Sequence, residues 1–219
     1  MNSTSESEKR IAAEAGAESV ADGMIVGLGT GSTVAYLLPA LAARGVDIRC
    51  VATSIATEGQ ARELGIVIQP FDQLERLDIA IDGADQIAPD GWLVKGAGGA
   101  HTREKIVAAA AERFVVIADS SKMVEQITAP IPVELLSFGL AATIRALGSV
   151  AIREGAAPSP DGGVIADFSG EVGDPIITAA LLAATPGVVD HGLFAPALVS
   201  EVLVGRGGGV ERIEVRAGS

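Results

Sequence analysis

Four charged side chains in the middle of the chain have the types and spacing that acid–base chemistry on a small polar ligand requires. They are Asp82, Asp85, Lys95 and Glu104. Residues 77–81 form a short apolar run that predicts a buried parallel strand, so both aspartates stand just past the strand's carboxyl end. That edge of an open α/β sheet is where ligands bind. Two carboxylates facing one pocket can there raise the pKa of one of them and provide an acid and a base.

Each of these residues also has a purely structural interpretation. Asp-Gly at a strand end is an ordinary turn, in which Asp85 can bond its own backbone. Glu104 in the first turn of a predicted helix over 104–114 would complement the helix dipole. The functional interpretation rests on the glycine-rich segment after Lys95, which lets backbone approach a ligand closely, with Glu104 beyond it. Lys122 is either a further cation at this edge or a solvated surface lysine.

Residues 27–33 form a second candidate site, a glycine-rich turn between a predicted strand at 24–28 and a predicted helix ending near Ala43. Ser32 stands at the third glycine position of a dinucleotide fingerprint, no acidic residue ends the next strand, and the lysine of a Walker A loop is absent. Hydroxyls beside a glycine turn at a helix N-terminus instead suit a single phosphate group. The alternative is a glycine turn with a Ser N-cap.

Composition narrows the classes of function. The 219 residues are enough for a large and a small domain. A net charge of -12 and only 3% aromatic residues argue against nucleic acid as a partner. The chain has no apolar run of about 18 residues, so we expect no membrane span. Cys50 is the single cysteine, which excludes internal disulfides and fits a buried thiol in a reducing cytoplasm. Without a Cys/His cluster, we expect no metal.

The pattern of elements predicts an α/β fold. Strands and helices alternate over residues 1–122, which indicates a Rossmann-like, doubly wound parallel sheet. From residue 130 the order changes to β-α-β-β-α-β, typical of a smaller ferredoxin-like α+β domain. We therefore predict a first domain over residues 1–129, rejoined by about 200–219, and a second domain over residues 130–199.

Taken together, the motifs resemble ribose-5-phosphate isomerase of the A type. The matching pieces follow the family's order along nearly the whole chain: Gly29–Thr33, Thr53-Ser54, Asp82–Asp85, Lys95-Gly96, Thr102–Lys105, Ala118–Lys122, Pro132–Glu134 and Pro186–Phe194.

The resemblance implies a cofactor-free aldose-ketose isomerase that interconverts ribose 5-phosphate and ribulose 5-phosphate through an enediolate, in the pentose phosphate pathway. It implies Glu104 as the base, Lys95 as a stabiliser of negative charge and Asp82 as a group that binds hydroxyls and assists ring opening. The implied substrate-binding residues are Thr30, Gly31, Ser32, Thr33, Asp82, Gly83, Ala84, Asp85, Lys95, Gly96, Ala97, Gly98 and Lys122. A cytoplasmic homodimer or homotetramer is also implied.

Two alternatives and two departures stay open at this point. A non-catalytic sugar-phosphate sensor domain or an acyl-CoA transferase relative would share parts of the pattern. Ala97 replaces a glycine that is usual in the family. Its Cβ either restricts the residue to negative φ or changes the affinity for the sugar. His101 stands where an apolar residue is common.

Overall fold

The computed structural model describes residues 3–72 and 74–215, and the chain divides into two compact units. Unit 1 comprises Met1–Ala84, Glu104–Lys122 and Pro196–Ser219, and unit 2 comprises Asp85–Arg103 and Met123–Ala195. Unit 2 thus also contains residues 85–103 and 123–129, which lie before the boundary expected at residue 130. Each unit has its own sheet and its own apolar core.

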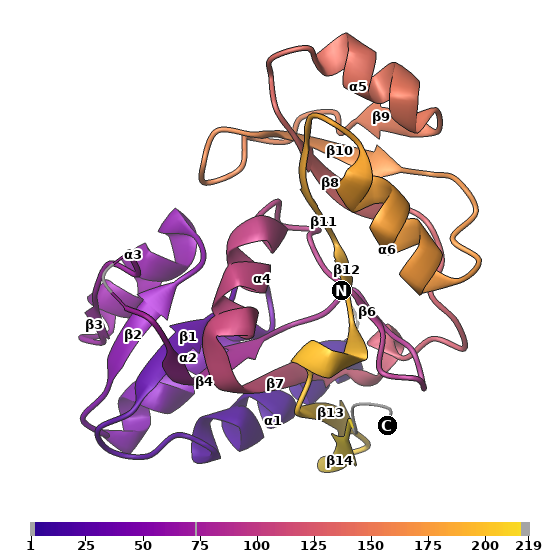
Figure 1. Cartoon of the computed structure of the whole chain (residues 1–219). Coiled ribbons are helices and arrows are strands. Elements are labelled where there is room, and N and C mark those ends of the chain that lie inside the picture. The colour runs from indigo at the N-terminus through magenta and orange to yellow at the C-terminus, as the bar shows by residue number, and fades with distance from the viewer. Residues whose placement is uncertain (1–2, 73, 216–219) are drawn as a thin grey trace. The chain divides into compact units, whose positions relative to one another are not determined.

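Unit 1 is built on a seven-stranded sheet (Figure 1). In spatial order its strands are β14 (Gly209–Glu214), β13 (Glu201–Arg206), β7 (Ala111–Asp119), β4 (Leu77–Asp82), β1 (Ile25–Leu28), β2 (Arg49–Ala52) and β3 (Val67–Ile68). All neighbouring pairs are parallel except β13 and β14, so the predicted parallel sheet is confirmed and gains an antiparallel edge. Gly207 and Gly208 join that last pair with φ of 55° and 89°, as a two-residue hairpin turn requires.

The centre of this sheet contains a topological switch point. Strands β1 and β4 are neighbours, but the chain continues from β1 to β2 on one side and from β4 to β7 on the other. Ligands of doubly wound folds bind at such a point, beyond the carboxyl ends of the two strands. Leu28 and Asp82 end these strands here.

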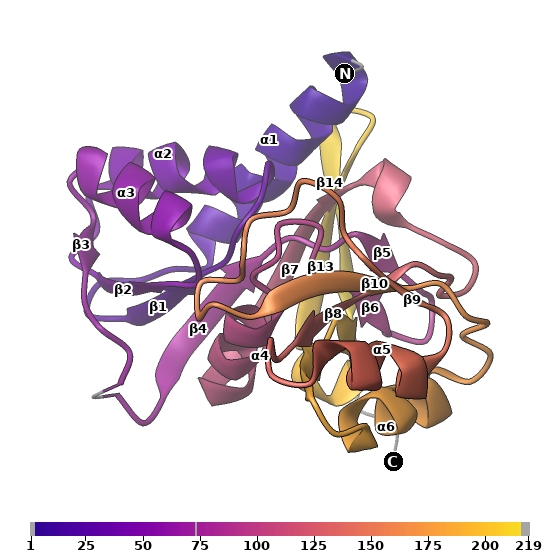
Figure 2. The ribbon, with the colours of Figure 1, turned by 90° about the horizontal axis from the view of Figure 1, so that it is seen from above.

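Helices cover both faces of the sheet in unit 1. They are α1 (Ser3–Glu18), α2 (Val34–Arg44), α3 (Ile55–Glu63), α4 (His101–Ala110, in unit 1 from Glu104) and the 3-10 turns η1 (Ser120–Lys122) and η2 (Pro196–Leu198). Figure 2 shows α1, α2 and α3 on one face and α4 on the other. Two glycines allow close packing: a Cβ at Gly16 would lie 2.9 Å from Ile117, and one at Gly27 would lie 2.4 Å from Val107.

The interior of unit 1 agrees with the apolar runs of the sequence. Helix α2 continues through Pro39 and buries Leu37, Leu38 and Leu41. Cys50 is fully buried, and this burial raises the pKa of its thiol to about 12, which makes it inert at neutral pH. No helix in the described ranges is long and apolar enough to cross a membrane.

Unit 2 contains the predicted ferredoxin-like sheet. Its antiparallel strand order is β11 (Val188–His191), β8 (Ile131–Leu135), β10 (Val164–Phe168) and β9 (Val150–Ile152), with α5 (Leu140–Leu147) and α6 (Pro175–Ala184) on one face (Figure 2). Trp92 packs in its core. A second sheet was not predicted, because its two-residue strands are too short to show a period: β5 (Gln86–Ile87), β6 (Leu93–Val94) and β12 (Leu193–Phe194).

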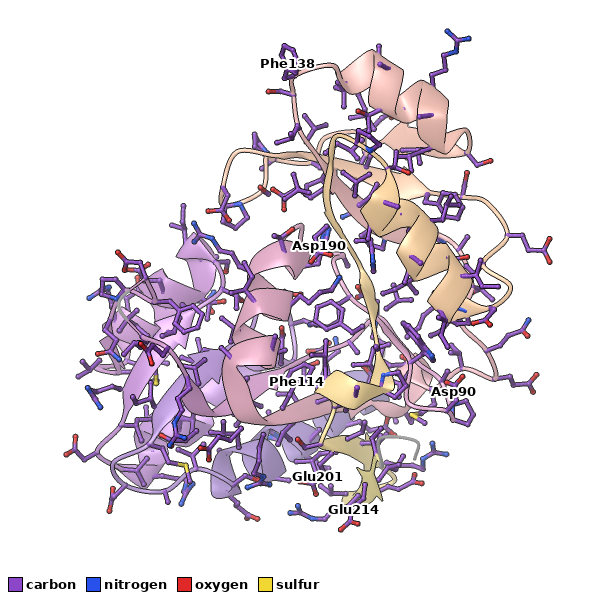
Figure 3. All side chains as sticks on the ribbon, viewed as in Figure 1. Asp90, Phe114, Phe138, Asp190, Glu201 and Glu214 are labelled. Atoms are coloured by element: carbon purple, nitrogen blue, oxygen red, sulfur yellow. The ribbon has the colours of Figure 1, made fainter. Side chains whose placement is uncertain are left out.

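Charged side chains add contacts at the β13–β14 edge of the sheet in unit 1. Figure 3 labels Glu201 and Glu214, which stand opposite each other across the hairpin and repel. Arg212 approaches the Glu201 carboxylate at 3.0 Å and Arg113 of β7 approaches it at 3.6 Å. The two arginines offset the repulsion and connect the hairpin to the neighbouring parallel strand.

A buried carboxylate connects helix α1 to the turn that follows the carboxyl end of β7. Glu8 of α1 accepts hydrogen bonds from the N–H of Ser120 at 3.0 Å and from its hydroxyl at 2.6 Å. The hydroxyl bond is the main reason that the pKa of Glu8 lies below its ordinary value. A Cβ at Gly205 would lie 2.0 Å from the Glu8 carbonyl oxygen, so α1 also lies directly against β13.

We expect Glu8→Gln to lower the free energy of unfolding at pH 7 by about 1–3 kcal/mol, since a hydrogen-bonded charge is lost. A lowered pKa stabilises the fold above the unfolded value near 4.5, and that contribution disappears as pH falls through the folded value. Urea unfolding should therefore show the gap between wild type and variant closing below about pH 4. A gap that stays constant down to pH 3 would contradict this role.

Candidate functional site

The Asp82 carboxylate holds the loop that follows β1. Asp82 ends β4 and is 3% exposed. Its Oδ1 accepts the N–H of Thr30 at 3.0 Å and that of Gly83 at 2.7 Å. A Cβ on Gly29 would lie 1.8 Å from the Asp82 Cγ, so a larger residue cannot occupy this position without moving the carboxylate. The predicted residues Thr30 and Asp82 are thus brought together at the switch point.

The hydroxyl groups of two buried threonines form hydrogen bonds with the same loop. The Thr30 hydroxyl lies 2.8 Å from that of Thr53, which follows β2. Thr57 of α3 donates its hydroxyl to the Gly29 carbonyl oxygen at 2.9 Å, and Ser54 caps α3 by accepting the Thr57 N–H. Thr53 and Thr57 were not among the predicted site residues. The signal for Thr53 was a hydroxyl directly after a strand.

The predicted phosphate-binding segment, residues 30–33, lies directly before α2. Gly31 has φ of 133°, which only glycine adopts readily, and Gly31 and Ser32 are exposed. Thr33, not Ser32, is the N-cap residue, and its hydroxyl makes no capping bond. The sequence alternative of a Ser N-cap is therefore not what the structure has. The N–H groups of this turn give a partial positive charge that suits an anion.

Three further predicted residues belong to unit 1. Glu104 lies in the first turn of α4 and is 4% exposed, although the helix begins three residues earlier than expected. Lys122 ends the turn η1 after β7 and is half-buried. Ala84 is the last residue of unit 1 before Asp85. A buried glutamate near a helix N-terminus is stabilised as the carboxylate by the helix dipole.

Lys95 is anchored inside unit 2. It is 2% exposed, and its N–H donates to the Gly192 carbonyl oxygen at 2.8 Å. Its Nζ lies 5.5 Å from the centre of the Phe194 ring, a cation–π contact that fixes the ammonium. A Cβ at Gly192 would lie 2.1 Å from the Lys95 carbonyl oxygen, so the two backbones pass very closely.

The segment after Lys95 contains Ala97 and packs against His101, the two departures from the family pattern. Gly96 has φ of 113°, and a Cβ there would lie 2.7 Å from Nδ1 of the fully buried His101. Ala97 has no positive φ, so its Cβ causes no backbone strain. The N–H of Ala97 donates to Asp85 Oδ2 at 2.9 Å, and its side chain is exposed together with Gly98. Alanine is therefore compatible with this loop.

The two units carry different functional groups. Unit 1 supplies two buried carboxylates, Asp82 and Glu104, and an anion-binding turn. Unit 2 supplies a buried ammonium, Lys95, next to a glycine loop with exposed backbone. Carboxylates can accept hydrogen bonds from hydroxyl groups and a proton from carbon. An ammonium group or a backbone N–H can stabilise a negative charge.

Comparison with known proteins identifies a family. Residues 49–209 match the profile of ribose 5-phosphate isomerase A (phosphoriboisomerase A). Ribose-5-phosphate isomerase A of Caulobacter sp. (strain K31) is 43% identical over 224 residues, covering 96% of this chain and 99% of that protein.

Solved structures agree with this match. The ribose 5-phosphate isomerase A of Neisseria gonorrhoeae has a TM-score of 0.92 at 33% identity, covering 98% of this chain and 99% of that one. A D-ribose-5-phosphate isomerase in complex with phospho-erythronic acid has a TM-score of 0.90 at 35% identity, covering 98% and 100%.

We expect Gly29→Ala to destabilise the fold by about 2–4 kcal/mol, because the new Cβ overpacks the switch point and displaces a hydrogen-bonded carboxylate. Gly59→Ala in α3 is the matched control, since a Cβ there meets nothing within 4 Å. The control should gain about 0.5–1 kcal/mol from helix propensity. Equal unfolding free energies for the two variants would show that the contact at Gly29 is unimportant.

Proposed function

The chain belongs to the ribose 5-phosphate isomerase A family, and on that premise we propose that Glu104, Lys95 and Asp82 carry out its reaction. The reaction is the interconversion of D-ribose 5-phosphate and D-ribulose 5-phosphate, an aldose–ketose isomerisation. The observation that carries the proposal is a carboxylate, Glu104, buried in the first turn of α4. The comparisons do not favour the sensor and acyl-CoA transferase alternatives.

The proposed mechanism moves one proton between neighbouring carbons. Glu104 removes the proton from C2 of the open-chain aldose, and the electron pair forms the C1–C2 double bond of an enediolate as O1 becomes negative. The same carboxyl group returns the proton to C1, while the O2 proton moves to O1 and C2 becomes the carbonyl carbon. A positioned base of this kind supplies a rate factor on the order of 10²–10⁴.

Lys95 supplies the electrostatic part of the proposal. Its ammonium is buried and fixed over Phe194, so it needs little reorganisation as negative charge develops on the sugar oxygens. Asp82 and Asp85 accept hydrogen bonds from sugar hydroxyls, and Asp82 assists ring opening. Backbone groups of Gly83, Ala84 and the segment 96–98 complete the contacts with the sugar.

The phosphate is assigned to the turn Thr30–Thr33 and to Lys122. The turn before α2, in which Gly31 and Ser32 are exposed, and the lysine ammonium provide positive charge locally, in a chain whose net charge is -12. Local donors are needed because the field of the whole protein repels the phosphate dianion.

We also propose a cytoplasmic homodimer or homotetramer that acts in the pentose phosphate pathway. Helix α6 supports self-association, because its sequence from Pro175 to Ala184 has no charged residue and its Ile177 and Leu181 are 68% and 57% exposed. Phe138, which projects from the loop before α5 in Figure 3, is 91% exposed. Apolar side chains exposed along one uncharged helix form the kind of surface that protein interfaces bury.

Glu104→Gln should lower kcat by about 10²- to 10⁴-fold, because the amide cannot accept the C2 proton. Binding of ribose 5-phosphate, measured by calorimetry, should change little. Glu63→Gln on the exposed end of α3 is the control and should retain full turnover. If wild-type protein binds the sugar phosphate but forms no ketose, the sensor alternative holds.

Ile177→Glu should shift the protein toward the monomer, since burying the new carboxylate in an interface costs about 2 kcal/mol or more. Light scattering after size-exclusion chromatography measures the mass. Val67→Glu places the same change on the 59% exposed Val67 of edge strand β3 and should leave the mass unchanged. An unchanged oligomer for Ile177→Glu would place the interface elsewhere.

A further inference from the structure

Arg153 donates hydrogen bonds to the backbone of the glycine loop of unit 2, residues 96–99. It follows β9, and its Nη1 donates to the carbonyl oxygens of Gly96 and Ala97 at 3.0 Å each. Its Nε and Nη2 donate to the two carboxylate oxygens of Asp167 at 2.8 and 2.5 Å. The bidentate pair fixes the plane of the guanidinium, and both side chains are about three-quarters buried. Arg153 is absent from the predicted site residues.

A second charge holds the same peptide from the other side. Asp85 Oδ2 accepts the N–H of Ala97 at 2.9 Å, so the peptide unit between Gly96 and Ala97 lies between a carboxylate and a guanidinium. The hydrogen bond to Asp167 raises the pKa of Arg153, and the charge of Asp85 raises it further, so Arg153 stays charged at all working pH values. The glycine-rich loop also closes its own turn, in which the Gly99 N–H donates to the Gly96 carbonyl oxygen at 3.0 Å, and Arg153 adds a side-chain donor to that oxygen and one to the Ala97 carbonyl oxygen.

The direction of the next N–H follows from peptide geometry. In a planar trans peptide, the C=O and the N–H point in opposite directions. The one cis peptide bond in the described ranges precedes Pro130, so the peptides of this loop are trans. Since the carbonyls of Gly96 and Ala97 both point at Arg153, the N–H groups of Ala97 and Gly98 both point to the opposite side. Asp85 accepts the N–H of Ala97, and the N–H of Gly98 points to the same side.

We propose that Arg153, held by Asp167, is a positioning residue that aims the Gly98 N–H at the enediolate oxygens. The inference rests on the proposed function, in which Asp85 and the segment 96–98 contact the sugar. Arg153 itself touches no reacting atom and acts through the loop. A lysine cannot replace it, because one ammonium cannot hold two carbonyls and a bidentate carboxylate in one plane. A purely structural pair between β9 and β10 is the competing interpretation.

Two ligands separate these interpretations. Phospho-erythronic acid carries a planar, anionic carboxylate that resembles the enediolate, whereas ribitol 5-phosphate is a flexible polyol that resembles the ground state. A donor aimed at developing negative charge should matter for the first ligand and not for the second. A change in stability alone would affect both ligands equally or neither.

The test compares Arg153→Lys, Arg153→Met and Asp167→Asn with wild type in kcat, KM and the dissociation constants of both ligands. We expect both Arg153 variants to lose about 10- to 100-fold in kcat and in affinity for phospho-erythronic acid, with ribitol 5-phosphate affinity within about twofold of wild type. Asp167→Asn, which keeps the arginine but loosens it, should show a smaller loss of the same kind. Arg62→Met is the matched control, because Arg62 makes a two-nitrogen bond to Glu58 on exposed helix α3.

Three outcomes would overturn the inference. They are unchanged kcat in the Arg153 variants, equal losses for the two ligands, and full activity of Arg153→Lys. A thermal unfolding scan identifies variants that fail to fold. If the Arg153 variants fail to fold, the test rests on Asp167→Asn, for which the loss of affinity for phospho-erythronic acid is compared with that for ribitol 5-phosphate. Failure of the proposed function is distinct from these outcomes, since wild-type protein would then form no ribulose 5-phosphate.

Discussion

The contact between the Asp82 carboxylate and the loop after β1 is the constraint on which the centre of unit 1 depends. Parallel pairing places Leu28 opposite Ile81, so the two strand ends meet and the next residues of each must share one small space. Gly29 leaves that space for the carboxylate, which then accepts the Thr30 N–H. The direction of the loop, and with it the start of α2, follows from this arrangement. A side chain proposed to bind sugar hydroxyls therefore also shapes the proposed phosphate turn.

Carboxylates inside this acidic protein are held by N–H and O–H donors. Glu8 accepts from Ser120, and Glu134, 2% exposed in β8, accepts from the hydroxyls of Thr102 at 2.5 Å and of Ser159. Such donors satisfy a buried carboxylate without adding charge. The hydrogen bonds of Glu8 and Glu134 are thus made by uncharged groups. In the proposed site, positive groups placed near the phosphate explain how a chain with a net charge of -12 can bind a sugar phosphate.

Opposite charges on the two sides of the Ala97 peptide give the glycine loop of unit 2 a fixed direction. Asp85 takes the N–H and Arg153 takes the carbonyls, so the loop keeps the close backbone approach that glycines permit without their disorder. The Ala97 side chain is exposed and its backbone unstrained, which accounts for the tolerance of alanine in a run of glycines.

The sequence by itself determined the elements and the local motifs, because apolar period, glycine turns and strand-end carboxylates are encoded within a few residues. The parallel sheet, the ferredoxin-like unit and the positions of Asp82 at a strand end and of Glu104 in the first turn of a helix were all predictable in this way. Strand pairing between distant segments decided the rest. Thr53 meets Thr30, which is 23 residues away in the sequence, only because β1 and β2 pair. Arg153 meets Gly96 across a separation of 57 residues. Such partners leave no local signal, since their contact depends on how sheets align and not on neighbouring residues.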